Sequence, residues 1–156
     1  MCIYEPMCLC GENYLRNQNG MVTKRLLDEL TYKIIGCAIE VHKQLGPGLL
    51  ESVYQKYFIQ ELCLRSLKFV NQVLTPINYK GTVLEADLRL DVLVEDFIIV
   101  ELKSMEGILP VHEAQLLTHM KLLQKPKGIL INFNCTNIFK EGQKKMVNEY
   151  YAQLPA

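Results

Sequence analysis

The stretch that decides the fold is RLDVLVEDFIIVELKS, from Arg89 to Ser104. Its first half alternates apolar and polar residues, which predicts a strand with one face toward the core. Glu95-Asp96 predicts a turn, and the continuous apolar run that begins at Phe97 predicts a second strand buried on both faces. The stretch is therefore expected to form a β-hairpin at the centre of a sheet.

The alternation begins before this stretch, and Leu93 is its one exception. Side chains two residues apart in a strand point the same way. The pattern predicts one shared apolar face made of Leu84, Ala86, Leu88, Leu90, Val92 and Val94.

The spacing around the turn also predicts a close pair of acidic side chains. If the hairpin is centred near Asp96, Asp91 and Glu101 lie opposite each other, each five residues from the centre. Directly opposed side chains have Cβ atoms roughly 4.5–5.5 Å apart, and two carboxylates so close repel unless a cation lies between them. Lys103 is two residues beyond Glu101 and is expected on the same face.

These three groups match the needs of metal-assisted phosphodiester hydrolysis. Carboxylate oxygens hold Mg²⁺ or Mn²⁺, which polarises the phosphate and activates a water. A nearby lysine can orient that water or neutralise charge that develops on the phosphate. A Glu-x-Lys sequence is also typical of a solvated strand edge, so spacing alone leaves both interpretations open. Charges at the end of a buried strand nevertheless need a reason.

The rest of the chain predicts a mixed α/β domain. Apolar residues recur at helical spacing before Gly46-Pro47-Gly48, a sequence that ends a helix. A second helix follows, so the chain begins with a helical hairpin. The expected elements are helices over 24–45, 50–65 and 111–124, strands within 68–79, 84–94, 97–104 and 128–133, and a strand or helix within 138–151.

Composition fits one globular domain. The 156 residues are 49% hydrophobic and 22% charged, and no apolar run is long enough to span a bilayer. The first residues do not resemble a signal peptide, and the six cysteines show no CxxC spacing. Reduced structural cysteines are therefore favoured over disulfides or zinc ligands, and a cytoplasmic location without membrane contact is expected.

The charges are unevenly distributed although their sum is +0. Acidic residues dominate between 85 and 113, and lysines dominate between 121 and 145. This distribution suits a metal site beside a surface that holds a polyanion, but two ordinary solvated faces would give the same pattern. The zero sum argues mildly against a dedicated nucleic-acid-binding protein.

Two motifs resemble a known family. Asp91 with Glu101-Leu102-Lys103 resembles the D…(D/E)xK signature of the PD-(D/E)XK nuclease superfamily, and LGPGLLESVY, with Gly48, Glu51 and Tyr54, resembles the motif of its GxxExxY branch. The resemblance runs from about residue 30 to 148. It implies a restriction-endonuclease-like α/β core, in which a mixed central sheet is flanked by helices and preceded by a helical hairpin.

The resemblance also implies roles for individual residues. Asp91 and Glu101 would be metal ligands, and Lys103 the catalytic lysine. Glu51 resembles an acidic residue on an N-terminal helix that helps to bind metal or water. The alternative role for Glu51 is to stabilise the N-terminus of its helix through the charge of its carboxylate. Tyr54, one turn further on, is expected to pack rather than to take part in chemistry.

Gln115-Leu-Leu-Thr-His119 resembles the QxxxY motif of RecB-like members, with histidine in place of tyrosine. The resemblance includes Gln115 among the site residues and leaves the role of His119 open. His112 shares their helix face, which could approach the metal or the substrate backbone. For His112 and His42, a capping or partly buried role is favoured over metal binding.

The sequence thus predicts a tail over 1–22, a nuclease-like domain over 23–151 and a short tail over 152–156. The predicted function is a Mg²⁺- or Mn²⁺-dependent nuclease that acts on nucleic acid, with DNA favoured over RNA. The alternative is an accessory or binding module that keeps the fold without catalysis. Whether the protein forms a homodimer or binds a partner protein stays open.

Overall fold

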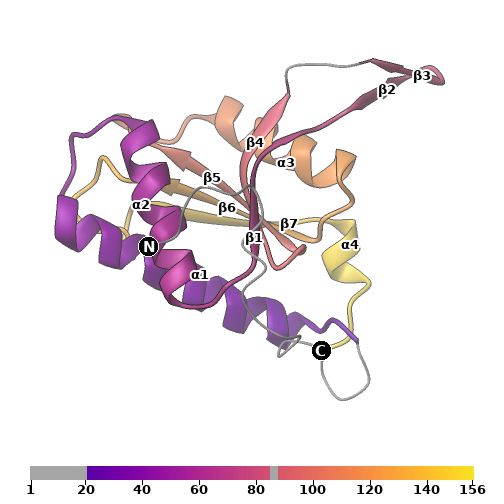
Figure 1. Ribbon diagram of the computed structural model, residues 1–156. Helices are drawn as coiled ribbons and strands as arrows, with labels where there is room; N and C mark the ends of the chain where they lie inside the picture. Colours follow the sequence, from indigo (N-terminus) through magenta and orange to yellow (C-terminus); the bar gives the residue numbers. More distant parts are fainter. Residues whose placement is uncertain (1–20, 85–87) are drawn as a thin grey trace.

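The computed structural model describes residues 21–84 and 88–156, so nearly all of the predicted N-terminal tail lies outside the described residues. Figure 1 shows the helices and strands of the structure, which include the predicted elements in the predicted order and also a separate pair of short strands over residues 77–84 that was not predicted. They are α1 (Lys24–Leu45), α2 (Glu51–Leu64), β1 (Phe69–Leu74), β2 (Ile77–Tyr79), β3 (Thr82–Leu84), β4 (Arg89–Val94), β5 (Ile98–Lys103), α3 (Pro110–Leu122), β6 (Lys127–Asn132), β7 (Gln143–Val147) and α4 (Glu149–Ala152).

Five strands form one mixed sheet in the order β1-β4-β5-β6-β7, with β5 at its centre. Strands β5 and β6 pair in parallel, and the other neighbours pair antiparallel. The apolar run of β5 is buried on both faces, as predicted, because Ile98, Ile99 and Val100 are all fully buried.

Helices cover both faces of this sheet. Helices α1 and α2 pack on one face in a large core that includes Leu30, Phe58 and Val100. Helix α3 packs on the other face in a smaller core that includes Leu116 and Ile99. The predicted fold class, a restriction-endonuclease-like mixed α/β core with an N-terminal helical hairpin, is confirmed.

The turn between the first two helices fixes where α2 begins. Gly46 has a φ of 69°, in the left-handed region that glycine adopts without strain, and its N–H donates to the carbonyl of His42 at 2.7 Å. The chain then reverses, and α2 begins at Glu51. This places the Glu51 carboxylate in the first turn of α2.

Of the predicted apolar face of the first hairpin strand, Ala86 and the side chain of Leu84 lie outside the described residues, and the prediction for Leu90 is wrong. Val92 and Val94 lie in the large core, but Leu90 lies in the smaller core beneath α3. Val73 of the neighbouring strand β1 changes face at the same level. The change coincides with Gln72, whose φ of 53° breaks the regular extended geometry that alternation assumes.

Two features lie outside the main sheet or at its end. Strands β2 and β3 form a separate two-stranded hairpin that projects from the body (Figure 1). The ambiguous segment near residue 138 contains β7 and the short helix α4, after which Leu154 packs against the large core. Among the described helices, none has the length and hydropathy of a membrane span.

Candidate active site

The β4–β5 hairpin positions the acidic pair. Its residue pairs, from Val94–Ile98 to Val92–Val100, are centred on Asp96 as predicted. The pairing ends there, one residue before Asp91 and Glu101, and the negative charge of Glu101 still acts on the Asp91 carboxyl. At this level the Asp91 side chain replaces a backbone acceptor, because its Oδ2 accepts a hydrogen bond from the Leu102 N–H at 2.8 Å. The Asp91 carboxylate is thus fixed on the strand that carries Glu101.

Asp91 lies in an environment that disfavours its charge. Burial, and next the negative charge of Glu101, raise the pKa of the Asp91 carboxyl from its ordinary value of 3.8 to about 7. The Leu102 N–H and the Lys103 ammonium act in the opposite direction, but their effect is smaller. The negative charge of Glu51 also raises this pKa, with a smaller effect than burial or Glu101, and a bound cation would offset the charges of both glutamates.

Glu101 is almost completely buried, with 2% of the residue exposed. Its Oε1 lies 2.7 Å from Nδ1 of His119 on helix α3, which is itself fully buried. Its Oε2 accepts no hydrogen bond within the described part of the chain. One oxygen is therefore held by the helix, and the other is available to a ligand.

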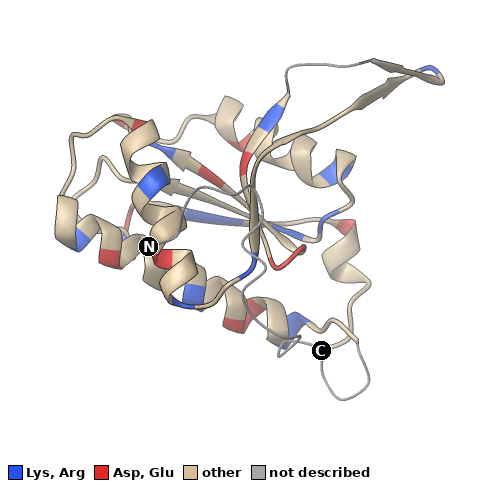
Figure 2. Cartoon of the chain, in the orientation of Figure 1, with Lys and Arg blue, Asp and Glu red and all other residues tan. Residues whose placement is uncertain are grey.

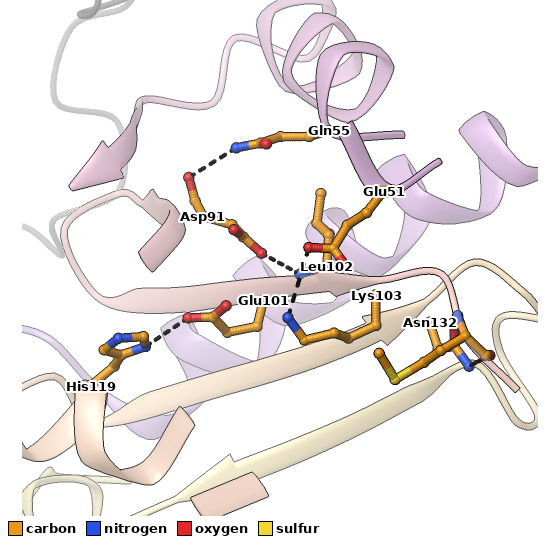
Figure 3. A network of polar contacts seen from close by, with 9 residues as sticks. Glu51, Gln55, Asp91, Glu101, Leu102, Lys103, His119 and Asn132 are labelled. Carbon is orange, nitrogen blue, oxygen red and sulfur yellow. Dashed lines mark hydrogen bonds and ion pairs between the residues drawn. The ribbon is translucent and has the colours of Figure 1, made fainter. Parts of the chain in front are cut away.

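Lys103 completes the cluster at the end of β5 (Figure 3). Its Nζ lies 3.8 Å from Oε1 of Glu51, and the lysine side chain is only 12% exposed against 42% for Glu51. Ser104 ties the end of β5 to the start of α2 through a 2.6 Å hydrogen bond from its Oγ to the Leu49 carbonyl. In Figure 2 an acidic and a basic segment lie next to each other at this end of β5.

Helix α2 contributes a second contact that the sequence did not suggest. The Gln55 side-chain amide donates to the Asp91 carbonyl at 3.4 Å. Gln55 lies one helical turn after Glu51, so one face of α2 approaches both Asp91 and Lys103. This contact joins the helix to strand β4 beside the carboxylates.

The donor set fits a hard divalent cation that keeps several waters. Within residues 21–84 and 88–156, no three His, Cys, Asp or Glu side chains are grouped as a metal site. Asp91 and Glu101 provide two carboxylates, and one or two carboxylates with waters and substrate phosphate are a usual coordination for Mg²⁺. Glu51, the third predicted ligand, lies 3.8 Å from the Lys103 ammonium and also acts electrostatically on Asp91, so its role as a ligand stays a prediction.

The predicted site residues on helix α3 differ in exposure and in contacts. Gln115 is exposed and forms no hydrogen bond with the described residues, whereas His119 is the side chain that contacts Glu101. His112 accepts from the Leu109 N–H at 3.0 Å and caps its helix, as favoured. The position of His119 was visible in the sequence, because it lies on the same helical stripe as the apolar residues Leu116, Met120 and Leu123.

The remaining two candidates have structural roles, as favoured. Tyr54 is fully buried and stacks on Phe133 with ring centroids 4.4 Å apart. Its hydroxyl donates to the Gly46 carbonyl and accepts from the Leu49 N–H, which holds the loop before α2. His42 is half-buried and its Nε2 lies 2.9 Å from the Cys135 carbonyl.

A mixed sheet that carries two carboxylates and a lysine on its central hairpin defines a nuclease-type α/β protein. The chain belongs to the PD-(D/E)XK nuclease superfamily, whose family model matches residues 28–146. Membership indicates a nuclease-type function with nucleic acid as substrate, and divalent metals are typical of such nucleases. Comparison with curated proteins and with solved structures found no match to this chain.

Proposed function

We propose that this protein is a Mg²⁺- or Mn²⁺-dependent nuclease that hydrolyses phosphodiester bonds in DNA. The observation that carries the proposal is the convergence of Asp91, Glu101 and Lys103 at the end of the central strand β5. An acidic pair with one buried and one half-buried carboxylate is costly unless it binds a cation, so its presence favours a metal site over a solvated strand edge.

Each charged group has a distinct role in this proposal. Asp91 and Glu101 would hold the metal through carboxylate oxygens that accept no hydrogen bond from the described residues of the protein. When bound, the metal supplies a Lewis acid for the phosphate and lowers the pKa of a water. Lys103, almost buried, positions the attacking water or neutralises the charge that develops on the phosphate. Glu51, which is 42% exposed, sets the position of the Lys103 ammonium.

The proposal extends to the GxxExxY branch and to helix α3. Gly48 has a φ of 96° that favours glycine, Glu51 opens α2, and Tyr54 fixes the loop between them. The three motif residues thus act as one unit that brings Glu51 to Lys103. Gln115, exposed on α3, is proposed to contact the substrate backbone rather than the metal.

The test is a cleavage assay on single-stranded DNA, double-stranded DNA and RNA, each with Mg²⁺, Mn²⁺ or EDTA. We expect cleavage of DNA with either metal and none with EDTA. Glu101→Gln removes one ligand charge at nearly constant volume, so it is expected to abolish cleavage while the protein still unfolds cooperatively. Cleavage that persists in this variant would show that another site, or a contaminant, is responsible.

The alternative of an accessory module makes a different prediction. If the fold is kept without catalysis, wild-type protein will cleave none of the three substrates with either metal. Calorimetric titration with Mn²⁺ then distinguishes a metal-binding module from a protein that has lost the site. RNA cleavage without DNA cleavage would correct the substrate and leave the site intact.

A further inference from the structure

His119 is a fully buried ionisable side chain to which the proposed reaction assigns no role. It lies on the inner face of α3, beside the apolar side chains of Leu116 and Met120. Burying an imidazole among such residues is costly unless its polar atoms are paired. An apolar residue would pack here more simply, so the position calls for a specific function of the ring.

The contacts of the ring favour a proton on Nδ1. Nδ1 lies 2.7 Å from Oε1 of Glu101, whereas Nε2 is buried and has no hydrogen-bond partner among the described residues. A neutral imidazole has one N–H donor and one bare nitrogen. With the proton on Nδ1, the ring donates to the carboxylate. With the proton on Nε2, two acceptors would face each other and a buried N–H would be unpaired.

The packing of α3 prevents the ring from moving away. Helix α3 lies directly on β6 at Gly128, where a Cβ atom would lie 2.7 Å from Sδ of Met120 and 2.8 Å from Cδ1 of Leu116. These two residues flank His119 on the same helical stripe. This close approach of helix and strand limits how far α3, and His119 with it, can move relative to the sheet.

We propose that His119 is a positioning residue that acts through Glu101. Its Nδ1–H fixes the carboxylate by one oxygen, and Oε2 is left as the oxygen that a divalent cation can use. This inference rests on the proposed metal-dependent function. Partners that orient a metal ligand in this way typically change metal affinity or activity by about 10–100-fold when they are replaced.

The test replaces His119 by Asn or by Gln, two amide side chains that place their N–H donor at different positions. The side-chain nitrogen of Asn corresponds roughly in position to Nδ1 of histidine, whereas that of Gln reaches toward Nε2. We expect Mn²⁺ affinity, measured by calorimetry, to fall by about 10–100-fold in His119→Leu and His119→Gln and to be largely restored in His119→Asn. Met120→Leu, a swap of similar volume on the same helical stripe, is the matched control and should bind as wild type.

The outcomes separate this inference from the proposed function. Wild-type protein that binds no Mn²⁺ would overturn both. Wild-type binding that is equally strong in the Leu, Gln and Asn variants would overturn the positioning role alone. If His119→Leu fails to fold, as judged by thermal unfolding in EDTA, the Mn²⁺ affinities of His119→Asn and His119→Gln still test the positioning role.

A second measurement needs no metal. ¹⁵N NMR of the histidine-labelled apoprotein should show the ring proton of His119 on Nδ1, identified by its loss in His119→Asn. A proton on Nε2 instead would overturn the inference, because the ring would then donate nothing to Glu101.

Discussion

Two β-hairpins of the described chain, β2–β3 and β4–β5, both turn through two successive residues with positive φ. In the β2–β3 hairpin the turn residues Lys80 and Gly81 have φ values of 50° and 87°. In the β4–β5 hairpin Glu95 and Asp96 have φ values of 51° and 65°. Two successive residues with positive φ are typical of the tight turns that suit the twist of a hairpin. The two turns thus share this backbone twist, although the β4–β5 connection, Glu95 to Phe97, is one residue longer than the β2–β3 connection.

What differs is the surroundings. Strands β4 and β5 lie inside the main sheet, whereas β2 and β3 pair only with each other within the described chain and leave Tyr79 and Val83 about 60% exposed. The β4–β5 turn tolerates non-glycine residues because Glu95 exchanges two 2.8 Å hydrogen bonds with Lys68. The comparison teaches that neighbouring strands and helices, rather than the turn, bury the charged side chains of a hairpin.

The largest expected effect concerns the pH dependence of the apoprotein. The pKa of Asp91 is raised to about 7 in the folded state and is ordinary, near 3.8, in the unfolded state. The folded protein therefore keeps the proton more strongly. The stability that this proton contributes is complete below about pH 4 and is lost as the pH rises through about 7, with an upper limit of roughly 4 kcal/mol.

Asp91→Asn should remove this loss. Because Asn carries no charge next to Glu101, the variant is expected to be more stable than wild type at pH 8 in EDTA and to differ less at pH 4. Urea unfolding at both values measures the change. Asp96→Asn, in the exposed turn of the same hairpin, should not become more stable than wild type on going from pH 4 to pH 8. If both variants respond alike, burial of Asp91 is not the cause.

The next effect compares one lysine from each hairpin. Lys103→Ala is expected to lower the cleavage rate by about 10²–10³-fold, the range seen when one donor that stabilises a developing charge is removed. Lys80→Ala removes the only charged residue from β2, β3 and their turn, and should change the rate little. Equal losses in the two variants would mean that the lysines act through general attraction of the substrate, which higher salt would weaken in both.

The fold and the acidic pair were predictable because period-two alternation and hairpin symmetry are local properties. Asp91 and Glu101 followed from counting residues around Asp96. The contacts from elsewhere in the chain were not predictable in this way. His119 and Gln55 reach the hairpin from helices whose position depends on packing against the whole sheet. For the same reason the sequence overestimated alternation at Leu90, where β1 and β4 change face together.

A matched pair of valines tests whether the hairpins differ in stability as they do in burial. Val100 is fully buried and Val83 is 63% exposed. Val100→Ala should lower the free energy of unfolding by about 2 kcal/mol, from lost burial and the cavity that remains. Val83→Ala should change it by less than about 0.5 kcal/mol. A large loss in Val83→Ala, measured by urea unfolding, would show that the projecting hairpin is buried against something in solution.

The smallest expected effect decides between the two interpretations of Glu51. Its pair with Lys103 spans 3.8 Å and is half exposed on the acidic side, so the pair contributes at most about 1 kcal/mol to stability. If Glu51 positions Lys103 for chemistry, Glu51→Gln should lower the cleavage rate about tenfold, a loss of about 1.4 kcal/mol in the barrier.

If Glu51 only stabilises the N-terminus of α2, the same variant should lose about 0.3–1 kcal/mol of stability and no rate. Glu113→Gln makes the equivalent change in the first turn of α3, where the carboxylate pairs with Lys144 instead of a site residue. A rate that falls in Glu51→Gln and not in Glu113→Gln assigns Glu51 to the β4–β5 hairpin. Rates unchanged in both confine the reactive charges to the hairpin itself.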